Sequence, residues 1–193
     1  MQRSKTLATC LTLLAGYVLF KAVSAEFVPA ERAVVLGGMY HWTALVALVA
    51  GWSVALARKG WSAGTWLGDV KQLLRPTFTY ALLAAVAVYG WNHVWAKEST
   101  ALRKSIRIAQ VEEFTKSDAA FDAYLLTLPL GQRATMPDRK TMHTQAISQV
   151  EWMMSGGVTF ALSLLMYVFA AALLTAVASL LLHQIWGIQS FQE

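Results

Sequence analysis

The sequence is poor in charged residues, cysteine and proline. Only 14% of its 193 residues are charged, against about 25% in soluble globular domains. In contrast, 56% of the residues are hydrophobic and the mean hydropathy is +0.46. A soluble core of this chain length cannot enclose that much apolar surface, so we expect lipid to be the solvent. The length leaves no room for a separate soluble domain, and we predict a single membrane domain over residues 1–193.

The one cysteine, Cys10, lies inside the first apolar run. A single cysteine forms no intrachain disulfide, and it excludes a metal site built from several cysteines. The residues before Cys10 resemble a lipoprotein signal only faintly, because the apolar stretch that precedes it is too short. We therefore interpret Cys10 as a buried core residue.

Four apolar runs are long enough to cross a hydrocarbon core of about 30 Å as helices. They cover about residues 6–28, 33–57, 78–96 and 157–186. The sequence therefore predicts an all-α integral membrane protein, with four transmembrane helices packed as a bundle. Lys21 lies near the far end of the first run, and we expect its ammonium group to extend to the lipid headgroups.

Basic residues are concentrated before the first run and between runs two and three. These two segments hold Arg3, Lys5, Arg58, Lys59, Lys71 and Arg75, whereas the loop between runs one and two holds only Lys21 and Arg32. Short cytoplasmic loops carry the excess of Lys and Arg. We therefore predict a bacterial plasma-membrane protein with both termini in the cytoplasm. The net charge of +5 then reflects membrane anchoring, and we expect no binding to nucleic acid.

Most tryptophans fall near the predicted ends of the spans. Amphipathic indole rings prefer the membrane–water interface, so we interpret these residues as interfacial anchors. They are Trp42, Trp61, Trp66, Trp91, Trp95, Trp152 and Trp186.

Between runs two and three, apolar residues recur at helical spacing from Trp66 to Leu74, with Asp69 and Arg75 on the other side. This pattern predicts a short amphipathic helix that lies on the cytoplasmic membrane surface. The alternative interpretation is a helix that binds in the groove of a partner protein.

Residues 97–151 form the sizeable polar segment of the chain, which we expect to be helical and extracytoplasmic. Leu102, Ile106 and Ala109 make an apolar stripe at helical spacing, while Ser117 and Asp138 occupy N-cap positions of two further helices. The segment holds 15 of the 27 acidic and basic residues, in nearly balanced numbers. A docking surface and a solvated cap both fit this composition.

Three histidines lie within predicted spans: His41 and His93 toward the outer side, and His183 toward the cytoplasmic side. Histidines on neighbouring helices are what a b-type haem needs for axial ligation, so a haem- or quinone-binding electron-transfer subunit is one hypothesis. The alternative is that His41 and His93 are interfacial residues beside tryptophans. The sequence contains no zinc-protease spacing, phosphate-binding glycine loop or nucleophile elbow, so we predict no catalytic residue, no metal site and no other cofactor.

Ionisable residues in the middle of a span usually mark a transport path. The sequence places none at mid-depth in any of the four runs. A small-solute or lipid transport protein is therefore the third and least favoured hypothesis.

Small residues repeat at four-residue steps along three of the spans. Such ridges let helices approach closely in lipid, where no hydrophobic force drives them together. We predict that they pack within this bundle, or against another subunit. They are Ala47, Gly51, Ala55, Ala81, Ala85, Ala171, Thr175 and Ser179.

The order of these parts resembles the bacterial membrane family of domain of unknown function 4199. The matching pieces are Lys59–Gly60 leading to Trp66–Leu67, then Tyr80–Trp91, Leu102–Leu126 and Thr159–Leu182. The resemblance implies the four-span architecture, and it brings no activity or functional residue with it. From the plain spans and the polar segment we expect an accessory or scaffold subunit that packs against a larger membrane complex. Its expected partners are membrane lipid and other membrane subunits, or further copies of the chain.

Overall fold

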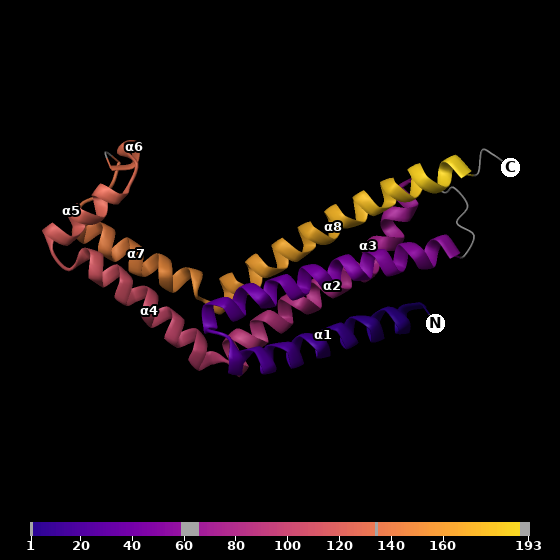
Figure 1. The fold of residues 1–193 in the computed structure, drawn as a ribbon, viewed down its shortest axis with the longest axis horizontal. Helices are drawn as coiled ribbons and strands as arrows, with labels where there is room; N and C mark the ends of the chain where they lie inside the picture. The colour runs from indigo at the N-terminus through magenta and orange to yellow at the C-terminus, as the bar shows by residue number, and fades with distance from the viewer. Residues whose placement is uncertain (1, 59–65, 134, 190–193) are drawn as a thin grey trace. The chain divides into compact units, whose positions relative to one another are not determined.

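The structure is a computed structural model that describes residues 2–58, 66–133 and 135–189 (Figure 1). These residues are helical almost throughout, and no strand occurs among them. The elements in chain order are α1 (Gln2–Phe27), α2 (Ala30–Arg58), α3 (Trp66–Gly90), a π-helical turn η1 (Trp91–Trp95), α4 (Lys97–Thr115), α5 (Asp118–Thr127), α6 (Leu130–Arg133), α7 (Arg139–Met153) and α8 (Gly156–Gln189).

Among the described residues, four helical stretches are long and apolar enough to cross a membrane. They are Ser4–Phe27, Arg32–Arg58, Trp66–Trp95 and Gly156–Gln184. The predictions of an all-helical fold and of four helices long and apolar enough to span a membrane are confirmed, and these helices indicate a multi-pass membrane protein.

Contacts divide the chain into two compact units. The first, here called the four-helix unit, contains α1, α2, α3 and α8 from Phe160 onward. The second, here called the hairpin unit, covers residues 91–159. It is built on α4 and α7, which lie side by side (Figure 1).

The core of the four-helix unit receives side chains from all four of its helices. Cys10 of α1, Leu45 of α2, Tyr80 of α3 and Ala170 of α8 are fully buried in one cluster. The prediction that Cys10 is a buried core residue is thus confirmed.

Helix α3 begins earlier than expected and runs through Pro76 without a break. The prediction of a separate amphipathic helix before Pro76 is therefore wrong. Proline is tolerated inside a spanning helix where neighbouring side chains and helices satisfy the backbone, and here Thr77 Oγ1 donates to the carbonyl oxygens of Leu73 and Leu74 at 3.0 Å. The buried face of α3 continues from Tyr80 back to Asp69, which is 2% exposed rather than on a solvated face.

A π-helical turn separates α3 from α4. The Ala96 amide donates to the Trp91 carbonyl at 2.7 Å, a spacing of five residues. Thr100 Oγ1 donates to the Asn92 carbonyl at 2.7 Å, and Arg103 donates to the Asn92 side-chain oxygen at 3.0 Å. The turn is therefore held by side chains of the first turns of α4.

Two predicted helix caps are confirmed in the hairpin unit. Ser117 Oγ accepts from the Ala120 amide at 3.2 Å at the start of α5. Asp138 Oδ1 accepts from the amides of Lys140 and Thr141, both at 3.0 Å, at the start of α7. These side chains satisfy amides that the first turn of a helix leaves without a partner.

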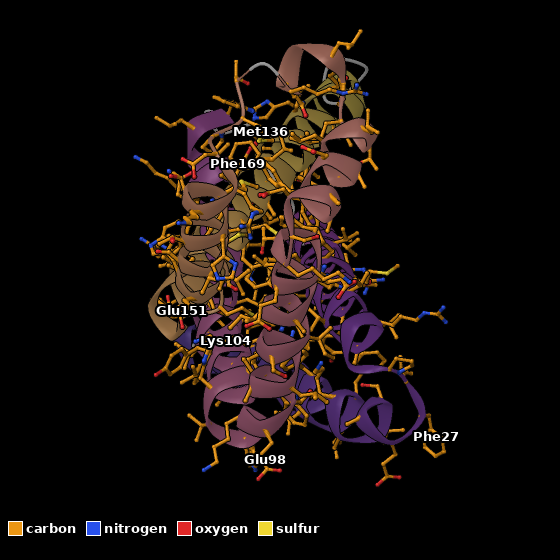
Figure 2. The ribbon with its side chains drawn as sticks, turned by 90° about the vertical axis from the view of Figure 1, so that its left-hand side faces the viewer. Phe27, Glu98, Lys104, Met136, Glu151 and Phe169 are labelled. Carbon is orange, nitrogen blue, oxygen red and sulfur yellow. The ribbon has the colours of Figure 1, made fainter. Side chains whose placement is uncertain are left out.

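Polar contacts join α4 to α7 along the hairpin. Lys104 and Glu151 form an ion pair at 2.9 Å, and both are labelled in Figure 2. Thr115 Oγ1 lies 2.8 Å from His143 Nδ1, and Arg139 donates to the Thr115 carbonyl at 2.8 Å. Because these contacts span much of the length of α4, they fix which face of α4 meets α7.

Candidate functional site

A histidine ringed by tyrosines lies inside the four-helix unit. His41 is fully buried, and its Nδ1 atom lies 2.9 Å from the Tyr80 hydroxyl oxygen. Its ring centroid is 4.2 Å from that of Tyr17, 5.1 Å from Tyr167, 5.8 Å from Tyr40 and 5.9 Å from Tyr80. Each spanning helix contributes one of these four tyrosines, which we call the tyrosine cage.

The cage encloses a hydrogen-bonded pair, His41 and Tyr80, among aromatic rings. Either partner can donate between His41 Nδ1 and the Tyr80 hydroxyl, depending on the imidazole tautomer. In the part of the chain that the structure describes, no hydrogen-bond partner faces His41 Nε2. Polar groups buried at membrane depth are functional-site candidates by default, and each of the four spanning helices places one tyrosine ring near this imidazole.

Lys21 lies near the cage and is buried. It is 4% exposed, and its Nζ donates to the Ala33 carbonyl at 2.9 Å, joining α1 to α2. The prediction that Lys21 extends to the lipid headgroups is therefore wrong. The physical reason is the Ala33 carbonyl, which accepts from the ammonium group and draws the lysine stem against α2. The stem passes Gly37, where an added Cβ atom would make ordinary contact, 3.4 Å from Lys21 Cδ and 3.5 Å from Tyr17.

A second polar contact joins α3 to α8. Asp69 Oδ2 lies 2.9 Å from His183 Nε2, and the Asp69 side chain is only 3% exposed. The sequence pattern did not predict this pair, because it placed Asp69 on a surface helix. The spacing in the sequence could have predicted it. If the helix continues through Pro76, then Asp69, Leu73 and Tyr80 lie on one helical face.

Five of the eight predicted packing residues are buried in the four-helix unit. Thr175 Oγ1 lies 3.3 Å from Thr77 Oγ1, and Ser179 Oγ donates to the Trp66 carbonyl at 3.3 Å. The five are Ala81, Ala85, Ala171, Thr175 and Ser179.

The other three packing residues, Ala47, Gly51 and Ala55, are exposed on α2. They line a groove between α1 and α2 with a volume of about 560 Å³. The groove is also lined by Lys5, Thr9, Leu13, Leu48, Trp52 and Leu56. A Cβ atom added at Gly51 would meet nothing within 4 Å, so this ridge faces open space rather than another helix of the same unit.

The second predicted haem ligand lies in the hairpin unit. His93 Nε2 lies 3.2 Å from Thr159 Oγ1, whereas His41 belongs to the four-helix unit. Haem or quinone ligation by this pair stays a prediction. Across the described ranges, no three His, Cys, Asp or Glu side chains gather as metal ligands do.

The predicted interfacial tryptophans are exposed to different degrees. Trp42, Trp66, Trp95 and Trp152 are 40%, 46%, 74% and 62% exposed. Trp91 is half-buried, with its ring centroid 6.3 Å from that of Trp95. Trp61 and the side chain of Trp186 lie outside the described residues. The role of all seven as membrane anchors stays a prediction.

The hairpin unit exposes part of its apolar surface. Leu102 and Ile106 of α4 are 58% and 42% exposed, whereas Val111 and Phe121 are buried at 7%. The predicted apolar stripe of α4 therefore does not pack against α7.

No family model, no curated protein and no solved structure matches this chain. The resemblance to the family of domain of unknown function 4199 stays a prediction.

Proposed function

We propose that the chain is an accessory subunit that docks onto a larger complex in a bacterial plasma membrane through its hairpin unit. In this proposal the four spans form a bundle, both termini lie in the cytoplasm and the hairpin unit lies outside. The observation that carries the proposal is the apolar stripe of α4, Leu102 and Ile106, which its own unit leaves uncovered.

The two sides of α4 have different surroundings. Lys104, Val111 and Thr115 face α7 through an ion pair, burial and a hydrogen bond. At about 100° per residue, Ile106 lies about 200° from Lys104 around the helix axis. The stripe is thus on the far side of α4 from α7, where only a surface beyond the hairpin unit can cover it.

The charges of the hairpin unit favour a protein surface over anionic lipid. Residues 97–151 hold eight Lys or Arg and seven Asp or Glu, and several are ion-paired, as in Lys104–Glu151 and Arg139–Asp118. Attraction to anionic lipid would require a basic excess. Apolar residues exposed beside paired charges are typical of protein interfaces with an apolar centre and a polar rim.

Photo-crosslinking in living cells tests the proposal. A photoreactive amino acid is placed at Leu102 or Ile106, with Glu112 as the matched control, because Glu112 is exposed on the same helix but about 120° from Ile106. We expect one crosslinked protein of defined mass from positions 102 and 106 and none from 112. Equal crosslinking from all three positions, or crosslinks to lipid alone, would refute docking by this stripe.

The orientation is tested separately with single cysteines in a background in which Cys10 is replaced by Ala. Glu112→Cys and Arg58→Cys both place a thiol on an exposed position, the latter at the last residue of the second candidate span. We expect a membrane-impermeant maleimide to label position 112, and not position 58, in intact spheroplasts. The reverse pattern would overturn the orientation.

A further inference from the structure

We propose that the groove between α1 and α2 binds one acyl chain of an anionic phospholipid, with the lipid phosphate held at Lys5. The groove has a volume of about 560 Å³, within the range of about 300–1,000 Å³ that small-molecule sites occupy. This proposal rests on the four-helix unit alone and is independent of docking by the hairpin unit.

The length of the groove matches one leaflet of a bilayer. On α1 its lining runs from Lys5 to Leu13, and on α2 from Ala47 to Leu56. Eight or nine residues at 1.5 Å each span about 12–14 Å, whereas half of the hydrocarbon core measures about 15 Å. The groove therefore has the length of an acyl chain within one leaflet.

The groove stops where α1 and α2 come together. The Tyr40 hydroxyl donates to the Leu13 carbonyl at 2.8 Å. One turn further along α1, a Cβ atom on Gly16 would clash with the same hydroxyl. The two helices are therefore in close contact just past Leu13 and leave space between them toward Lys5.

Charge is found at the end of the groove where a headgroup would lie. Lys5 is the second residue of the first candidate span, which begins at Ser4, so its ammonium group belongs at a membrane surface. Among the described residues that line the groove, Lys5 is the one with a charged side chain. Arg58 is exposed two residues beyond Leu56, at the last turn of α2. Basic sites between spanning helices bind anionic lipid headgroups.

The floor of the groove is shaped for a narrow apolar chain. Ala47, Gly51 and Ala55 stand at four-residue steps and present almost no side chain, while Leu13, Leu48 and Leu56 provide apolar walls. A phospholipid whose acyl chain lies on this floor places its phosphate at the Lys5 ammonium.

Native mass spectrometry of the full chain in nonionic detergent tests the site with added phosphatidylglycerol or phosphatidylcholine. We expect one retained phosphatidylglycerol per chain. Gly51→Leu fills the groove and should abolish retention, whereas Gly38→Leu, on the same helix and equally open, should leave it intact.

Lys5→Gln should weaken binding about fivefold, and the exposed Lys71→Gln should not. Ala55→Leu is a second filling variant, and circular dichroism shows that each variant is folded.

Each of the following results would contradict a different part of the lipid-binding proposal. Equal retention by Gly51→Leu and the wild type, or equal loss in Gly38→Leu, would overturn the site. Equal retention of both lipids, unaffected by Lys5→Gln, would overturn the headgroup contact. Thermal stabilisation by inorganic phosphate as large as that by phosphatidylglycerol would overturn the acyl-chain contact. A second protein chain that occupies the groove and that lipid does not displace would overturn the choice of occupant.

Discussion

The Nδ1 atom of His41 lies 2.9 Å from the hydroxyl oxygen of Tyr80, and both side chains are fully buried on the neighbouring helices α2 and α3. The two residues are 39 positions apart in the sequence, so this contact depends on how the two helices are rotated. It is therefore a sensitive probe of the packing of the four-helix unit.

Removal of the Tyr80 hydroxyl tests that contact. We expect Tyr80→Phe to lower the free energy of unfolding by about 0.6 kcal/mol, the average for hydrogen bonds between spanning helices, with about 1.7 kcal/mol as the upper bound. Tyr167→Phe is the matched control, because the Tyr167 ring also packs on His41 and no hydrogen bond links the two. The measurement is unfolding in mixed micelles, and an equal loss in both variants would contradict the role of the hydroxyl.

Close approach of α1 and α2 at Gly16 gives a second prediction. A Cβ atom at Gly16 would clash with the Tyr40 hydroxyl, so we expect Gly16→Ala to destabilise the protein by about 1–3 kcal/mol through overpacking. Added Tyr40→Phe removes the clashing oxygen and should restore part of that loss. Gly38→Ala, which meets no atom within 4 Å, should be neutral or slightly stabilising. Additive effects of Gly16→Ala and Tyr40→Phe would show that the two positions do not touch.

The Asp69–His183 contact gives a third prediction. Loss of one partner from a buried pair leaves a polar group without compensation, so Asp69→Leu and His183→Leu should each destabilise the protein. The double variant should lose less than the sum, with a coupling of about 0.5–3 kcal/mol. Lys71→Leu, on an exposed position of the same helix, is the control. A coupling near zero would mean that the pair does not join α3 to α8.

The start of α7 gives a pH prediction. Hydrogen bonds from the Thr141 hydroxyl and from the amides of Thr141 and Lys140 lower the pKa of Asp138 below its ordinary value of 3.8. The lowered pKa means that the folded state favours the carboxylate, so its stabilisation is present above pH 3.8 and is lost as pH falls through the folded pKa.

Hydrogen exchange at the amides of Lys140 and Thr141 measures this loss. We expect protection to fall in the acid range in the wild type. Asp138→Asn keeps a good N-cap that cannot titrate, so its protection should stay level over the same range. A fall of equal size in Asp138→Asn would show that another group controls the pH response.

The positions of the spans and of two helix caps were predictable from the sequence because their signals are local. Apolar runs set the four spanning helices, and Ser117 and Asp138 act on amides two or three residues away. The continuous α3 was not predicted because Pro76 is a usual helix breaker in water. In this structure Thr77 bonds to the backbone of the preceding turn.

The buried polar groups were harder to predict because they depend on contacts between distant parts of the chain. His41 was singled out as a candidate, but its tyrosine cage draws one residue from each of four helices, so no single-helix pattern reveals it. Lys21 stands near the end of an apolar run, which predicts contact with headgroups, whereas its burial depends on the Ala33 carbonyl of the next helix, which accepts from its ammonium group. Ala47, Gly51 and Ala55 have the spacing of a packing ridge, although they line an open groove.

Native mass spectrometry of the complex extracted in mild detergent tests the proposed accessory role most directly. The account predicts that the wild-type chain of 21.2 kDa is retained in a larger assembly with a second polypeptide. It also predicts that the double variant Leu102→Glu, Ile106→Glu is released as a folded single chain, while Glu112→Lys remains assembled. A wild-type chain that is found alone, or an assembly that survives the double variant unchanged, would contradict the account.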